Sequence, residues 1–264
     1  MPRFAANLTR MFTDVPFMER FGAARAAGFD AVEVLFPYDG SAADIVEQLA
    51  RHTLDIVLIN CPPPNYAEGP RGFAAIPGGE ERFRHDLKRA LRYARALGAK
   101  HLHLMAGVAA GPAARAVFVA NLRWAVAQAR GLPLTIEPIN PVDMPGYFLN
   151  DFNMAADILA EVDAPGLYLQ FDAYHAHVIT GDVFATWEEI RPLVAHVQVA
   201  GYPGRHEPEA GVIDYPAFFD LLDAQGYAGW VSGEYDPVGR TEAGLDWCRR
   251  DARPAGTKRL ILQG

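Results

Sequence analysis

Short apolar runs alternate with longer amphipathic stretches along almost the whole chain. The short runs are rich in Val, Ile, Leu and aromatic residues, which is typical of buried strands. The predicted strands span residues 4–8, 31–36, 55–61, 101–105, 134–139, 168–172, 195–200 and 230–234. The stretches between them repeat apolar residues at helical spacing, and the predicted helices span residues 16–27, 42–52, 80–97, 113–130, 151–162, 183–193, 215–225 and 241–250.

Turn-forming and capping residues lie where these elements are expected to begin or end. Gly28, Gly98 and Gly226 each follow a helical run, at the position where a left-handed residue commonly ends a helix. Asp151 precedes a predicted helix and can accept a hydrogen bond from one of its first amide groups. Pro216 falls in the first turn of another, where its missing N–H removes no hydrogen bond. These residues support the predicted order of elements.

Eight successive strand-then-helix units predict an α/β fold, a single (β/α)8 TIM barrel. The main alternative is an open, doubly wound sheet, which usually has a glycine-rich phosphate loop after its first strand. The segment NLTRMFTD contains no such loop, so the barrel is favoured. Because no linker divides the chain, we predict one domain over residues 1–264, with a loosely packed C-terminal tail over 252–264.

Composition narrows the class of partner. Half of the residues are hydrophobic, and the formal net charge of −8 argues against a surface that binds nucleic acid phosphates. The two cysteines form no disulfide framework, the N-terminus lacks the features of a signal peptide, and no apolar run approaches the ~20 residues that span a bilayer. We therefore expect a cytoplasmic protein with a small-molecule substrate and neither nucleic acid nor membrane as partner. The sequence does not decide the oligomeric state, and a homo-oligomer is one possibility.

Four side chains whose oxygen atoms could bind a metal ion stand at the ends of the last four predicted strands. They are Glu137, Asp172, Gln198 and Glu234. A buried carboxylate is costly unless it is paired, and the C-terminal ends of barrel strands meet at one rim. Adjacent strands lie about 4.8 Å apart, so the four side chains could converge on one cation. Carboxylate and amide oxygens suit Mg²⁺ or Mn²⁺; alternatively, each is an isolated polar residue bonded to loop amides.

Glu137 and Glu234 also have the chemistry of an acid–base pair. A reaction that moves a proton between adjacent carbons needs a base on the substrate, and often an acid as well. A carboxyl group suits these roles when burial raises its pKa. A metal ion would polarise the carbonyl and stabilise the enediolate that deprotonation produces. The alternative is that both glutamates serve as ligands and nothing more.

Two further residues are candidates for substrate binding. His175 lies three residues after Asp172, in the loop expected after the sixth strand, and could donate a hydrogen bond to a substrate oxygen. Arg205 lies among turn residues after the seventh strand and could bind a substrate carboxylate bidentately. Structural roles, such as a surface ion pair for the arginine, remain open. His101 and His103 we expect to be packing or surface residues.

Six segments of the chain together resemble one known family. They are NLTRMF, AGFDAVEVLFPYD, IEPINPVDMPGYFL, QFDAYHAHVITGD, VAGYPGRHEPEAGVIDY and GYAGWVSGEYDPVGRT. The family is that of the hydroxypyruvate and 2-oxo-tetronate isomerases, which are xylose-isomerase-like TIM barrels, and the resemblance runs from about residue 3 to 250. Gly201 is a departure, because family members often have an acidic residue after the seventh strand.

The resemblance implies an aldose–ketose isomerase of a short hydroxy-keto acid, such as hydroxypyruvate converted to tartronate semialdehyde. The family's metal ligands correspond to Glu137, Asp172, Gln198 and Glu234, and its acid–base pair to Glu137 and Glu234. Substrate contacts of related epimerases correspond to His175 and approximately to Arg205. A divalent Mg²⁺ or Mn²⁺ is therefore the expected cofactor.

Three other functions remain open at this point. A ketose 3-epimerase would use the same ligands on a different carbon. A DNA-repair nuclease of the related barrel type needs more histidines and a surface that holds phosphates, which the acidic composition disfavours. A barrel without catalytic activity could bind a sugar acid or serve as a subunit.

Overall fold

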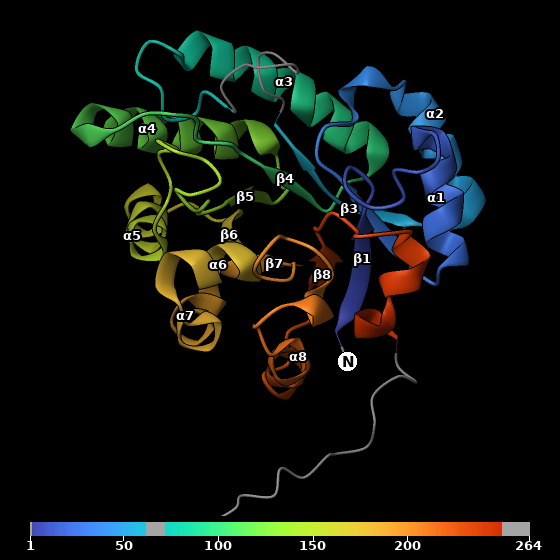
Figure 1. Ribbon diagram of the computed structural model, residues 1–264. Coiled ribbons are helices and arrows are strands. Elements are labelled where there is room, and N and C mark those ends of the chain that lie inside the picture. The colour runs from blue at the N-terminus through green and yellow to red at the C-terminus, as the bar shows by residue number, and fades with distance from the viewer. Residues whose placement is uncertain (1, 62–71, 250–264) are drawn as a thin grey trace, which may run out of the picture.

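The alternating pattern forms a closed barrel in the computed structural model, which describes residues 2–61 and 72–249 (Figure 1). Every strand pairs in parallel with the next strand of the chain, and the last pairs with the first. The predicted TIM-barrel fold is confirmed. The strands are β1 (Arg3–Asn7), β2 (Ala31–Val34), β3 (Asp55–Asn60), β4 (His101–His103), β5 (Leu134–Ile136), β6 (Leu167–Asp172), β7 (Val194–Val199) and β8 (Trp230–Gly233).

Helices surround the strands and follow one another around the barrel in chain order (Figure 1). They are α1 (Phe17–Ala26), α2 (Ala42–His52), α3 (Glu80–Leu97), α4 (Gly111–Ala129), α5 (Phe152–Val162), α6 (Ala173–Thr180), α7 (Val183–Ile190) and α8 (Tyr215–Ala224). Gly98 ends α3 with a left-handed φ of 68°, and the Asp151 side chain caps α5, as predicted. Among the described helices, none has both the length and the apolarity to cross a membrane.

Short 3-10 turns complete the described elements and account for one wrong prediction. They are η1 (Pro37–Asp39), η2 (Arg191–Leu193), η3 (Pro208–Ala210), η4 (Thr241–Gly244) and η5 (Asp246–Cys248). The helix expected over 241–250 is replaced by η4 and η5, and residue 250 lies outside the described residues. Trp247 turns into the core there and packs edge-on against Phe4, with ring centroids 5.2 Å apart. The predicted tail over 252–264 also lies outside the described residues.

Helix α6 has no counterpart among the predicted elements. It begins directly after β6, because the Asp172 side chain that ends the strand accepts a hydrogen bond from the Tyr174 amide at 2.8 Å and caps the helix. The helix has eight residues, too few for a helical period to stand out in the sequence. His175 therefore lies on a helix rather than in the expected loop, and its backbone is held by helical hydrogen bonds.

Aromatic side chains fill the layer between the sheet and the helices. Phe171 of β6, Trp187 of α7 and Phe218 of α8 are all buried, and their ring centroids lie 5.4–5.9 Å apart. Such rings bury large apolar areas and prefer tilted or edge-to-face contacts. This packing holds the helices that follow the site-bearing strands against the sheet.

We expect Phe218→Ala to lower the free energy of unfolding by about 3–5 kcal/mol, because it removes a fully buried ring and leaves a cavity. Urea denaturation followed by circular dichroism measures the change. Val238→Ala is the control, since that side chain is 74% exposed and its truncation should change little. A loss below about 1 kcal/mol for Phe218→Ala would contradict the packing described.

Candidate active site

A layer of hydrogen-bonded polar side chains crosses the interior of the barrel. Glu33 of β2 is fully buried, and its carboxylate accepts hydrogen bonds from Asn7 Nδ2 at 2.6 Å and Gln198 Nε2 at 2.7 Å. His196 Nε2 also lies 2.7 Å from this carboxylate. Because β2 and β7 are not neighbours in the ring of strands, the contacts of Glu33 with Gln198 and His196 span the interior. The layer fixes the side chains beneath the C-terminal mouth.

Three carboxylates emerge at that mouth, where the strands end. Asp172 ends β6, while Glu137 and Glu234 directly follow β5 and β8. Ligand atoms of Glu137, Asp172 and His175 all lie within 4.8 Å of one another. Arg205 Nη2 lies 3.0 Å from Asp172 Oδ2 and 3.2 Å from Glu234 Oε1. The structure thus brings the three predicted carboxylates together, with both glutamates lining one cavity of about 210 Å³.

Gln198, the fourth predicted ligand, does not line this cavity. Its amide nitrogen is held by Glu33, which turns its carbonyl oxygen toward Gln170 Nε2 at 2.6 Å. Gln170 Nε2 also lies 3.0 Å from Glu137 Oε2. The carbonyl oxygen of Gln198 is therefore engaged by Gln170 in this structure, with one lone pair left for a further interaction.

Arg205 is placed by the loop after β7. Gly201 N donates to His206 O at 2.8 Å, and a Cβ at Gly201 would lie 2.3 Å from Glu207 O, so only glycine fits this close approach. The loop turns at Arg205 itself, whose φ of 56° is in the left-handed region. Its guanidinium lies 5.1 Å from the centre of the Tyr174 ring, a favourable cation–π contact. The predicted substrate-binding arginine therefore reaches the carboxylates from a tightly specified loop.

His175 projects from α6 into the same cavity. Asn140 Nδ2 lies 2.7 Å from His175 Nδ1, and an amide nitrogen can only donate, so Nδ1 accepts and the neutral ring carries its proton on Nε2. Nε2 lies 3.6 Å from Asp172 Oδ2 and 3.9 Å from Glu137 Oε1. Burial lowers the pKa of His175 to about 4, with Asp172 opposing, so the ring is neutral near pH 7. His175 thus offers a hydrogen-bond donor to the cavity.

The two glutamates have raised pKa values. Burial raises the pKa of Glu234 to about 7, and the guanidinium groups of Arg205 and Arg10 oppose this shift. Burial and the charges of Glu234 and Asp172 raise the pKa of Glu137 well above its ordinary value. A carboxyl group with such a pKa can take up or release a proton near neutral pH, as acid–base catalysis requires.

The donor set at the mouth fits a divalent cation. Glu137 Oε1 is buried and has no hydrogen-bond partner within the described part of the chain. Arg205 compensates Asp172 and Glu234 but approaches no Glu137 oxygen as an ion pair in the described residues. Carboxylate oxygens are the donors that Mg²⁺ and Mn²⁺ prefer. A cation would therefore satisfy an oxygen that the described side chains leave unpaired.

Several residues that line the cavity are missing from the predicted site, and the polar ones are Arg10, Asn60, His103 and Asp143. Arg10 follows β1, and its Nε lies 3.4 Å from Glu234 Oε1. Asn60 and His103 are the last residues of β3 and β4, but neither carries a charge, so neither stood out in the sequence from the apolar run that contains it. His103 is fully buried, so the expected surface role is excluded and the expected packing role stays open. Residues two apart on a strand share a face, so His101 also points inward, with its ring 5.8 Å from that of His196.

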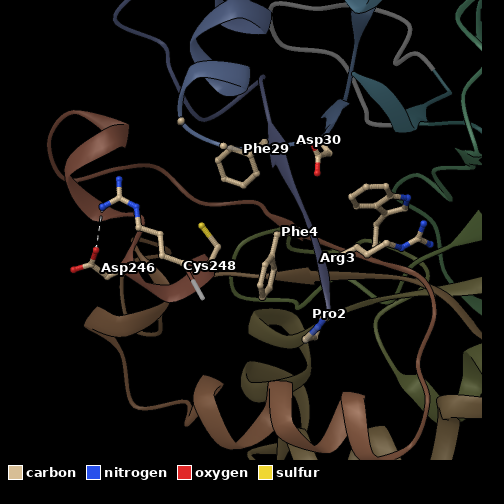
Figure 2. A pocket seen from close by; sticks show the side chains of 11 residues that line it. Pro2, Arg3, Phe4, Phe29, Asp30, Asp246 and Cys248 are labelled. Carbon is tan, nitrogen blue, oxygen red and sulfur yellow. Dashed lines mark hydrogen bonds and ion pairs between the residues drawn. The ribbon is translucent and has the colours of Figure 1, made fainter. Parts of the chain in front are cut away.

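A cavity of about 710 Å³ at the opposite mouth has a different character (Figure 2). It lies where β1 and β8 begin, and the charged residues Arg3, Asp30 and Asp246 on its wall are exposed. The Arg3 guanidinium covers the Trp230 ring at 4.5 Å. Catalytic groups of TIM barrels stand at the C-terminal ends of the strands, so the smaller cavity is the candidate active site.

Comparison with known proteins agrees with this architecture. The sequence model of the family described as xylose isomerase-like TIM barrel matches residues 21–251. A 2-oxo-tetronate isomerase of Cupriavidus necator is 44% identical, covering 94% of this chain and 98% of its own. The hydroxypyruvate isomerase of Escherichia coli is 39% identical with the same coverage of both chains. A crystal structure described as an AP endonuclease of family 2 from Brucella melitensis has a TM-score of 0.91 at 44% identity, covering 94% of this chain and 98% of that one.

These matches extend over nearly the whole chain, and the two curated relatives are isomerases, which confirms the predicted enzyme class. The resemblance inferred from six sequence segments is confirmed as well. The chain belongs to the xylose isomerase-like TIM barrel family.

Proposed function

We propose that the chain isomerises a short hydroxy-keto acid, interconverting hydroxypyruvate and tartronate semialdehyde or isomerising 2-oxo-tetronate. The observation that carries this proposal is the pair Glu137 and Glu234, both buried at one mouth with raised pKa values and lining one small cavity. The names of the relatives supply the substrate class, because they act on acids of three and four carbons.

The proton transfer can be followed on hydroxypyruvate. One glutamate removes a proton from C3, the C–H electrons form a C2=C3 double bond, and negative charge moves to the C2 oxygen, giving an enediolate. Protonation of C2 by the other glutamate, or by the same one, and transfer of the hydroxyl proton from O3 to O2 give the aldehyde. A carboxyl group whose pKa lies near neutral pH serves both directions of this transfer.

Positive and hydrogen-bonding groups in the cavity stabilise the charge. Arg205 supplies a guanidinium beside both Asp172 and Glu234, and the Nε2–H of His175 is available to a substrate oxygen. Arg205 and Arg10 together provide the positive charge that holds the substrate carboxylate. A divalent cation, held by Glu137, Asp172, Glu234 and the Gln198 carbonyl oxygen, would polarise the substrate carbonyl when bound.

The cavity favours this substrate class over the alternatives. At about 210 Å³ it is smaller than the about 300–1,000 Å³ common for drug-sized ligands, which suits an acid of three or four carbons. The Brucella structure is described by a nuclease family name, but three carboxylates crowd this mouth and the chain has a net charge of −8. Those charges oppose a polyanion, whereas two arginines can hold a single carboxylate.

The reaction predicts exchange of a carbon-bound proton with solvent. Incubated with Mn²⁺ and hydroxypyruvate in deuterated water, the wild type should place deuterium on the product carbon, as seen by NMR. Glu137→Gln and Glu234→Gln should each lower kcat by about 10²–10⁴-fold, since each removes a proton-transfer group. Glu161→Gln, an exposed carboxylate paired with Arg115, is the control and should retain the wild-type rate.

Wild type that turns over neither hydroxypyruvate nor 2-oxo-tetronate would refute the proposed function. A rate retained by both glutamine variants would refute the assigned roles while leaving isomerase activity standing. A barrel that only binds sugar acids would show binding by calorimetry and no exchange in any of these samples.

The raised pKa of Glu234 predicts a pH-dependent difference in stability between metal-free wild type and Glu234→Gln. The folded state binds this proton more tightly than the unfolded state, with a pKa of about 7 against 4.5. As pH rises from about 4.5 to 7, the unfolded state loses the proton first, so this group increasingly destabilises the wild type. The variant should gain up to about 3 kcal/mol relative to wild type over that range.

Urea denaturation in EDTA at several pH values measures this difference. Comparing the two proteins cancels the contribution of buried histidines, such as His103, whose lowered pKa acts in the opposite direction. Saturating Mn²⁺ should reduce the effect, because a cation replaces the proton as the compensating charge. A difference that stays constant from pH 4.5 to 7 would contradict the raised pKa.

A further inference from the structure

We propose that Asn60 and His103 form a hydroxyl-binding subsite that holds the end of the substrate remote from its carboxylate and selects a four-carbon acid over a shorter one. This inference rests on the proposed function, because it assigns the substrate's orientation in the same cavity.

Both side chains are buried polar groups without partners. Asn60 is 4% exposed and His103 is fully buried, and both line the candidate active-site cavity. Asn60 Oδ1 and both ring nitrogens of His103 have no hydrogen-bond partner within residues 2–61 and 72–249. His103 Nδ1 lies 3.7 Å from Glu137 Oε2, which is too long for a hydrogen bond. Leaving such groups unpaired costs about 1–3 kcal/mol each, which a ligand would recover.

The polar side chains of the interior layer behave differently. Glu33, Gln170 and Gln198 bond to one another or to neighbouring strands, and none of them lines the cavity. Ser232 Oγ is also unpaired but does not line the cavity. Asn60 and His103 therefore combine two properties that these side chains do not share: contact with the cavity and unsatisfied hydrogen-bonding atoms.

The chemistry of the pair matches a hydroxyl group. Asn60 is neutral, and complete burial beside His196 and His175 disfavours a charge on His103. An amide oxygen accepts a hydrogen bond, while a neutral imidazole offers one donor and one acceptor. A hydroxyl group both donates and accepts, so it can satisfy both residues. A carboxylate would bring a negative charge near Glu137 without a positive partner on this side.

The barrel places Arg205 on the other side of the cavity. β3 and β4 stand opposite β7 and β8 in the closed ring of eight strands. Arg205 follows β7, and Arg10 follows β1, which neighbours β8. A substrate whose carboxylate faces Arg205 points its hydroxyl end toward Asn60 and His103, with its reacting carbons between them, beside Glu137 and Glu234.

The test pairs a change in the ligand with a change in the protein. The probes are threonate, a four-carbon hydroxy acid, and 2,3-dihydroxybutanoate, which lacks only the 4-hydroxyl group. Dissociation constants are measured by calorimetry in Mn²⁺ for the wild type, Asn60→Leu and His103→Leu. Asn121→Leu is the matched control, because Asn121 is equally buried but bonds to Ala74 O outside the cavity.

We expect the wild type to bind threonate at least about tenfold more tightly than the deoxy acid, as one satisfied hydrogen bond allows. Asn60→Leu and His103→Leu should bring the ratio close to one by weakening threonate binding alone, and Asn121→Leu should keep the wild-type ratio. His103→Gln, which restores a donor and an acceptor, should recover part of the preference. A purely structural role would weaken both ligands equally.

A wild-type ratio near one, a ratio that survives in both leucine variants, or no binding of either acid to the wild type overturns the subsite. These binding measurements do not depend on turnover. Failure of the subsite can therefore be distinguished from failure of the proposed function. A wild type that isomerises neither acid but discriminates the hydroxyl group refutes the reaction alone. A wild type that isomerises hydroxypyruvate and ignores the 4-hydroxyl group refutes the subsite alone.

Discussion

The burial of three carboxylates at one mouth of the barrel is the constraint on which the rest of this site depends. Glu137, Asp172 and Glu234 crowd one mouth of the barrel, where ionised groups need nearby positive charge to remain charged. Arg205 compensates two of them directly. Burial that these positive charges do not compensate raises the pKa values of both glutamates. It also leaves one oxygen of Glu137 without a hydrogen-bond partner among the described residues. The incomplete compensation that makes the site costly also makes it receptive to a cation and to protons.

The interior of the barrel holds this arrangement in place. Glu33 fixes the amide of Gln198, and Gln198 and Glu137 both contact Gln170, so the mouth stands on a hydrogen-bonded base. The loop after β7 brings Arg205 back over the same base through a turn that only glycine at position 201 permits. Rigid support of this kind lets proton-transfer groups keep their positions while their charges change.

Much of the fold followed from periodicity, because buried parallel strands and amphipathic helices leave strong patterns in sequence. The carboxylates were found for a related reason, since a charge at the end of an apolar run is unusual. Asn60 and His103 obey the same positional rule but carry no charge, and so resembled ordinary strand residues. Arg10 follows β1 in an irregular loop, and its contact with Glu234 joins residues 224 positions apart, which no local pattern reveals.

A crystal structure with Mn²⁺ and tartronate, in which anomalous scattering locates the ion, is the most direct test of this site. We expect one anomalous peak bonded to oxygens of Glu137, Asp172 and Glu234, with a tartronate carboxylate on Arg205. An ion at the opposite mouth, or glutamates that bind neither ion nor ligand at saturating concentrations, would contradict it.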